Sequence, residues 1–109
     1  MVNMTFGEYL KELIKSAGMT QRSFYIDLDI KKPYFYEILS SKVNPPPPYL
    51  QFRAMEILSA DKQTRVEFFD LAAFERGEMP ADIKAITDKH PAFVNDIRKL
   101  LDTLLAGKK

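Results

Sequence analysis

The sequence predicts an all-α protein, in which a compact bundle of five helices is followed by a two-helix C-terminal extension. Three observations lead to this prediction. Apolar residues recur at helical spacing through most of the 109 residues, and no stretch alternates apolar and polar residues for long. Glycine and proline lie at the boundaries of the periodic segments. Capping residues stand where several of these segments begin.

The first helix is predicted to begin after Thr5. Thr5 and Glu8 have the spacing of a capping box, in which each residue satisfies a backbone N–H group of the other. Gly18 ends the helix, because glycine readily takes the left-handed conformation that closes a helix. One apolar face is formed by Phe6, Leu10, Leu13 and Ile14.

Two short helices follow, separated by a break at residues 29–31. Thr20 is the predicted N-cap of the first of them. Asp29 suits the turn because aspartate tolerates a positive φ better than most residues. The next helix covers residues 32–39, with Pro33 in its first turn, where a missing N–H costs least. The inward residues of this pair are Phe24, Leu28, Tyr34, Phe35, Ile38 and Leu39.

The remaining predicted elements are a loop at 40–48 and helices at 49–58, 62–76, 81–87 and 92–105. The four prolines that end the loop are interpreted as a rigid spacer, with a polyproline ligand as the weaker alternative. Asp61 caps the fifth helix and Gly77 stops it. The apolar residues assigned to the fourth and fifth helices are Leu50, Ala54, Ile57, Leu58, Val66, Phe69, Leu71, Ala72 and Ala73.

The composition excludes several classes of protein. Hydrophobic residues make up 46% of the chain and charged residues 28%, which indicates a globular rather than a disordered or membrane-spanning protein. There is no cysteine and a single histidine, His90, so we expect no disulfide, thiolate or His-rich metal site. The N-terminus has no signal-peptide pattern, and the expected compartment is the cytoplasm.

Residues 19–45, MTQRSFYIDLDIKKPYFYEILSSKVNP, carry the most informative pattern. Two short helices with a tight turn between them have the spacing of a helix-turn-helix, whose second helix enters a DNA major groove. This segment resembles the XRE class of lambda-repressor and Cro-like proteins. The preceding FGEYLKELIKSAG resembles the first helix of that class, and LQFRAMEILSADKQTRVEFFDLAAF resembles its fourth and fifth helices. MPADI and HPAFVNDIRKLL resemble an extension of some small bacterial members.

The resemblance implies a lambda-repressor-like domain at residues 1–77 and a helical extension at residues 78–109. Three positions depart from the family pattern. Tyr25 stands where the family usually has a small residue, Asp29 where it has glycine, and Lys31 where it has a Ser or Thr cap. With Tyr25, either the hydroxyl lies at the rim in water or the two helices are spread apart.

The resemblance also implies which residues contact DNA. Gln21 matches a phosphate-binding position, and Arg22 is a second phosphate candidate or a solubilising charge. Lys32 contacts guanine or a phosphate, while Tyr36 contacts a thymine methyl or a phosphate, or is a partly exposed aromatic. Glu37 accepts from cytosine or repels phosphates. The other candidates are Lys31, Pro33, Ser40, Ser41, Lys42 and Asn44.

The expected function is sequence-specific binding of double-stranded DNA by a small transcriptional repressor, without enzymatic activity, a cofactor or a metal. An antitoxin-like or controller protein, or an interaction module that has lost DNA binding, is the alternative, because the net charge is only +1. We expect a homodimer formed through the last helix, or a last helix that folds back as core on Phe68, Phe69 and Phe74. Seven of its residues are apolar: Phe93, Val94, Ile97, Leu100, Leu101, Leu104 and Leu105.

Overall fold

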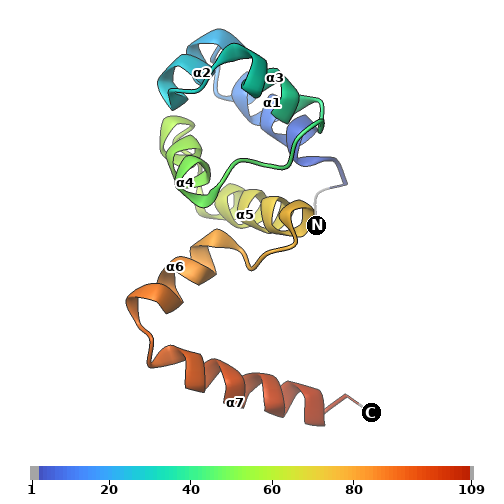
Figure 1. Cartoon of the computed structure of the whole chain (residues 1–109), viewed down its shortest axis with the longest axis vertical. Helices are drawn as coiled ribbons and strands as arrows, with labels where there is room; N and C mark the ends of the chain where they lie inside the picture. The colour runs from blue at the N-terminus through green and yellow to red at the C-terminus, as the bar shows by residue number, and fades with distance from the viewer. Residues whose placement is uncertain (1–2, 109) are drawn as a thin grey trace.

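The computed structural model describes residues 3–108, and within this range the chain forms helices and no strand (Figure 1). The all-α prediction is therefore confirmed. The helices are α1 (Phe6–Ser16), α2 (Gln21–Leu28), α3 (Lys32–Leu39), α4 (Pro48–Ile57), α5 (Lys62–Arg76), α6 (Ala81–Lys89) and α7 (Phe93–Ala106). Predicted and observed boundaries differ by two residues at most. Pro48 joins α4 because its fixed φ and missing N–H suit the first turn of a helix.

The predicted caps form at the starts of α1, α2 and α5. Thr5 Oγ1 accepts from the backbone N–H of Glu8 at 3.1 Å, and Glu8 Oε1 accepts from the backbone N–H of Thr5 at 2.9 Å. Thr20 and Asp61 each accept from the backbone N–H three residues further on, at 3.0 and 2.8 Å. The hydrogen bond from the backbone N–H of Thr64 also lowers the pKa of the Asp61 carboxyl.

The first five helices all end in the same way, with a residue in the left-handed conformation. The next residue donates its N–H to the carbonyl oxygen five positions earlier, at 3.0–3.2 Å, which satisfies an otherwise free carbonyl of the last turn. Glycine fills this position after α1 and α5, but other residues fill it after α2, α3 and α4. The five residues are Gly18, Asp29, Ser41, Ser59 and Gly77.

The hydrophobic core is built from α1–α5, with a small contribution from Ala81 of α6. α1 packs against α3 and α5, and α2 packs against α4. Met55 of α4 and Phe68 of α5 are fully buried, and Met55 was not among the apolar residues predicted for its helix. Val66 lies in α5 as predicted, but its side chain is 38% exposed. The buried face of α5 is centred on residues 68, 69 and 72, and Val66 lies to one side of it.

α1 approaches the end of α3 so closely that one position of α1 must be glycine. A Cβ atom on Gly7 would lie 2.6 Å from the carbonyl oxygen of Ile38, and closer still to that of Leu39. Both oxygens belong to the backbone of the last turn of α3, which cannot rotate away as a side chain could. Gly7 therefore sets the distance between these two helices.

The proline-rich connection between α3 and α4 is fixed to the core by two side chains. The Gln51 amide donates to the carbonyl oxygen of Pro46, and the Arg76 guanidinium donates to that of Pro45, each at 2.8 Å. Arg76 also pairs with the Glu78 carboxylate, whose pKa it lowers. Pro45 and Pro46 are buried. The prolines thus serve as a spacer whose carbonyl groups are already engaged.

A partly buried hydrogen bond between α1 and α5 predicts how stability responds to alkaline pH. The Tyr9 hydroxyl donates to Glu67 at 2.9 Å, and burial together with this carboxylate raises the pKa of Tyr9 to about 12. An unfolded tyrosine ionises near pH 10. The contribution of Tyr9 to stability is therefore complete below pH 10 and is lost as the pH rises toward 12. We expect chemical denaturation at pH 9 and 11.5 to show a smaller alkaline loss in Tyr9→Phe than in the parent. Tyr49→Phe, at an exposed tyrosine, should behave like the parent.

The last two helices extend away from the core. α6 contacts α5, whereas α7 has no buried residue and lies apart from the α1–α5 bundle (Figure 1). The Cα trace consequently measures 48 × 30 × 24 Å, with α2 and α3 at one end and α7 at the other. α7 does not fold back as core on Phe68, Phe69 and Phe74, and Phe74 is itself exposed, so the apolar face of α7 is left open.

Candidate nucleic-acid interface

α2 and α3 are joined by a three-residue turn that begins with a left-handed residue. Asp29 has φ 62° and ψ 44°, and its own N–H donates to the carbonyl oxygen of Ile26. Ile30 then donates to the carbonyl oxygen of Tyr25 at 3.1 Å. Asp29 therefore takes the left-handed turn conformation, as predicted from the tolerance of aspartate for a positive φ.

Phe35 holds the two helices together. Its ring is fully buried, with its centroid 6.0 Å from that of Phe24 and 5.3 Å from that of Tyr25. The large Tyr25 is accommodated in this cluster and is 8% exposed. The inward side of α3 is thus anchored by a tilted cluster of aromatic rings, and its outward side is fixed in direction.

The aromatic run in α3 does not form a continuous surface for stacking bases. Phe35 faces the core, Tyr34 is half-buried, and Tyr36 is 42% exposed with its ring edge-on to Phe35 at 5.3 Å. Successive helical residues point about 100° apart, which explains this division. Of the three rings, Tyr36 is the one available to an external partner.

The candidate DNA-binding residues belong to α2, to the turn before α3, to α3 and to the loop that follows it. Gln21 and Glu37 are half-buried. The remaining candidates are exposed: Arg22, Lys31, Lys32, Pro33, Tyr36, Ser40, Ser41, Lys42 and Asn44. They are distributed over the whole unit, since Lys32 begins α3 and Lys42 follows its last turn. The structure brings them onto one supersecondary unit rather than into a single pocket.

The basic side chains of this unit are not neutralised within the chain. Among residues 3–108, ion pairs join Arg76 to Glu78 and Lys84 to Asp88, and both lie outside α2 and α3. Arg22, Lys31, Lys32 and Lys42 therefore keep their charge for an external partner. Asp27, Asp29 and Glu37 on the same unit offset most of this charge. Any attraction for phosphates depends on placement, not on bulk charge.

The start of α2 presents free backbone donors beside Gln21. Thr20 caps the N–H of Ser23, whereas the N–H groups of Gln21 and Arg22 have no hydrogen-bond acceptor among the described residues. These groups and the helix dipole favour an anion at this end. Gln21 therefore stands beside two backbone donors that an anion could bind.

The loop after α3 has a fixed backbone. Ser41 adopts a left-handed conformation with φ 61°, and Lys42 donates its N–H to the carbonyl oxygen of Glu37 at 3.0 Å. The Ser40 hydroxyl donates to the same carbonyl at 3.3 Å. The side chains from Ser40 to Asn44 are thereby presented by an ordered turn instead of a free loop.

Gly7, which was not among the residues predicted for the site, also contributes to it. By admitting the last turn of α3 against α1, Gly7 helps to determine where that helix lies. The available signal was a glycine in the first turn of an otherwise strong helix, where alanine is intrinsically better by about 1 kcal/mol.

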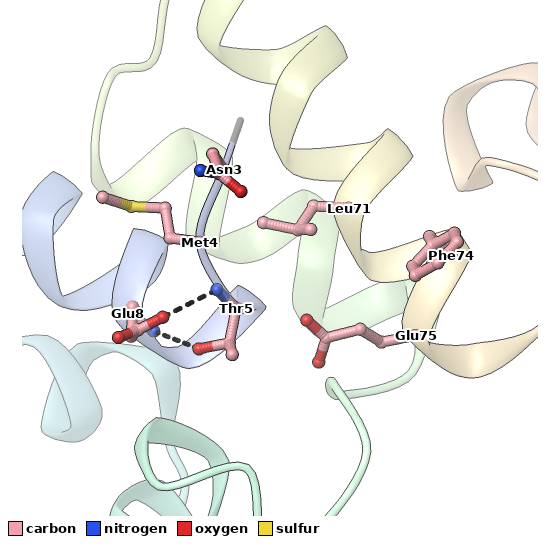
Figure 2. Close-up of a pocket in the computed structure, with 7 residues that line it drawn as sticks. All are labelled: Asn3, Met4, Thr5, Glu8, Leu71, Phe74 and Glu75. Atoms are coloured by element: carbon pink, nitrogen blue, oxygen red, sulfur yellow. Dashed lines mark hydrogen bonds between the residues drawn. The ribbon is translucent and has the colours of Figure 1, made fainter. Parts of the chain in front are cut away.

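A pocket of about 390 Å³ lies between the N-terminal segment and α5, away from the α2–α3 unit. Figure 2 shows Thr5 and Glu8 joined by two hydrogen bonds on one side of it, with Leu71, Phe74 and Glu75 on the other. The Glu75 carboxylate accepts from the backbone N–H at the start of α1 at 2.6 Å. The two carboxylates that line the pocket, those of Glu8 and Glu75, therefore both accept hydrogen bonds from backbone N–H groups at the start of α1.

Comparison of the chain with protein-family models, curated proteins and solved structures finds no match. Among the described residues, no cluster of three or more histidine, aspartate or glutamate side chains could hold a metal ion. Within residues 3–108, no helix combines the length and apolar character needed to cross a membrane. The α2–α3 unit is therefore the feature of the molecule from which a function can be inferred.

Proposed function

We propose that this chain is a lambda-repressor-like helix-turn-helix protein of the XRE class that binds double-stranded DNA and represses transcription in the cytoplasm. Residues 1–77 form the DNA-binding domain, and residues 78–109 form an extension that pairs two copies. The protein is not an enzyme and uses no cofactor. The supporting observation is a short α2–turn–α3 unit with Phe35 anchored inward and unpaired basic residues outside.

The residues of the unit divide into two roles. Gln21, Arg22 and Lys42 bind phosphates, because they lie at the ends of the unit beside free or ordered backbone N–H groups. Lys32 and Tyr36, exposed on α3, read bases in the major groove. Glu37, half-buried on the same helix, accepts from cytosine or repels phosphates.

Selection of binding sites from random duplex DNA by the purified protein tests this proposal. We expect a defined motif, and an affinity that falls with salt at a log–log slope of roughly −0.9 for each phosphate neutralised. With about three to five phosphate contacts per copy, the slope per copy is roughly −3 to −5. Binding at low salt with no preference over the random pool would remove the proposal.

Substitutions separate base reading from phosphate binding. Lys32→Ala and Tyr36→Ala should each change the selected motif, with a loss of about 1–3 kcal/mol at the affected base pair. Gln21→Ala should weaken binding to all sequences alike. Lys62→Ala is the matched control for charge, because Lys62 is exposed at the start of α5. If Lys32→Ala and Tyr36→Ala both selected the parental motif, α3 would not be the reading helix.

A second candidate function is protein binding by an antitoxin-like or controller protein, or by a module that does not bind DNA. The apolar surface of α6 and α7 and the nearly balanced charge of the α2–α3 unit favour it. Affinity for DNA separates these possibilities. A module that does not bind DNA would show no salt-dependent affinity for any duplex. An antitoxin-like protein would show that affinity and in addition require a partner for α6 and α7.

A further inference from the structure

The apolar surface of the chain is concentrated on α6 and α7. Large apolar side chains there are between 36% and 68% exposed, although the core of the same chain is fully buried. A 14-residue helix is only marginally stable in water unless it packs on something. The exposed residues are Ile83, Ile86, Phe93, Val94, Leu100, Leu101, Leu104 and Leu105.

A groove of about 250 Å³ runs between α6 and α7. Apolar side chains from both helices form its walls, and Thr87 and Asp96 are its polar members. The apolar lining residues are Ile83, Ile86, Phe93, Ile97 and Leu100. The groove is therefore suited to an apolar helix face and offers little to a charged ligand.

The pattern of α7 is that of a helix with two neighbours. Phe93, Ile97, Leu100 and Leu104 follow spacings of four, three and four, which make the seam of a left-handed bundle. Val94 and Leu101 widen this seam on one side. Three apolar positions in every seven are typical of a helix in a four-helix bundle, whereas a helix in a two-stranded coiled coil has two apolar positions in every seven.

We infer that α6 and α7 pair with the same helices of a second copy, with α7 of each copy in the α6–α7 groove of the other. The resulting four-helix bundle is two-fold symmetric and self-complementary, because one surface supplies both the groove and the helix that fills it. A stable interface buries roughly 800 Å² per partner, and the bundle would cover eight large apolar side chains of each copy that are now 36–68% exposed.

The charges of α7 favour a second copy over other occupants. Asp96 and Asp102 balance Arg98 and Lys99, so the helix is electrically neutral. A helix that binds a membrane surface is usually rich in basic residues on its polar face, and a helix for an acidic partner would carry an excess of them. Two neutral helices meet without net repulsion.

The role of this dimer on DNA rests on the proposed function, in which α2 and α3 bind DNA. α7 lies at the end of the molecule opposite α2 and α3, so pairing through α6 and α7 leaves both α2–α3 units free (Figure 1). A two-fold pair presents two reading helices to half-sites one turn of DNA apart, roughly 34 Å. Each copy then raises the effective concentration of the other on DNA.

Sedimentation of the intact chain without DNA, between 1 and 100 μM, tests the interface separately from DNA binding. We expect a dimer in the parent and in Asn95→Asp, which adds a charge to the exposed polar side of α7. Leu101→Asp and Leu104→Asp should each weaken dimerisation by roughly 100-fold or more, because an unpaired charge would be buried in the bundle. The α1–α5 core contains neither leucine, and circular dichroism should show it still folded.

Three results would overturn the inference. The first is a monomer at 100 μM in the parent, and the second is a dimer that Leu101→Asp and Leu104→Asp leave unchanged. The third is slow hydrogen exchange of the α7 amides in a monomer, which would mean that the helix folds back on its own chain. If only the proposed DNA binding is wrong, the protein will still dimerise. If only the dimer is wrong, the monomer will still bind a DNA half-site weakly.

Discussion

Gly7→Ala should destabilise the protein by about 3 kcal/mol or more, at the upper end of the range for overpacking. Helix propensity alone predicts the opposite, since alanine is favoured over glycine inside a helix by about 1 kcal/mol. The added Cβ would lie 2.6 Å from the carbonyl oxygen of Ile38 and closer still to that of Leu39. Because both oxygens belong to backbone, α1 and α3 must separate, and the steric term outweighs propensity.

Urea denaturation followed by circular dichroism measures this effect. Gly107→Ala is the matched control, because its Cβ would meet no atom closer than 3.6 Å and its φ is −78°. Gly18→Ala is a second control, with open space around it but a φ of 71°, and should cost about 1 kcal/mol. A Gly7→Ala midpoint equal to that of Gly107→Ala would contradict the close approach of the two helices.

The features that could be predicted from the sequence are those fixed by neighbouring residues. The capping box at Thr5 and Glu8, the caps at Thr20 and Asp61, and the left-handed Asp29 all depend on residues within a few positions of one another. Local hydrogen bonds decide such features, so the pattern and the structure agree on them.

The features that could not be predicted depend on contacts between distant segments. The requirement for glycine at position 7 comes from the last turn of α3. The hydrogen bond that fixes the carbonyl oxygen of Pro45 comes from Arg76 of α5. The open position of α7 was one of two alternatives in the sequence, because the same apolar face suits a core or an interface. Periodicity gives the width of that face, whereas tertiary packing decides what covers it.

The candidate site shows the same division. Helical periodicity separated the inward Phe35 from the outward Lys32 and Tyr36, and the exposure of these residues agrees with it. The placement of Tyr25 could not be predicted, since its ring is accommodated by a cluster whose members come from both helices. The contacts with DNA remain predictions for the binding experiments.

Phe35→Ala should cost about 3–5 kcal/mol, the usual loss when a fully buried phenylalanine is truncated. A domain of this size has a total stability of roughly 5–15 kcal/mol, so this single change removes a large part of it. The cavity would open between α2 and α3, where the ring now contacts Phe24, Tyr25 and Tyr36. We therefore expect the α2–α3 unit to lose its fixed geometry before the rest of the fold, and sequence-specific DNA binding to be lost with it.

Tyr36→Ala is the matched control, because it removes the neighbouring ring from the exposed side of the same helix. It loses one edge-on contact with Phe35, worth about 0.5–1.5 kcal/mol, and should leave the fold intact while changing the selected DNA motif. Denaturation midpoints and native-state hydrogen exchange of α2 and α3 compare the two variants. If Phe35→Ala unfolded at the same urea concentration as Tyr36→Ala, the ring of Phe35 would not be what holds the two helices together, and the outward direction of Lys32 and Tyr36 would need another cause.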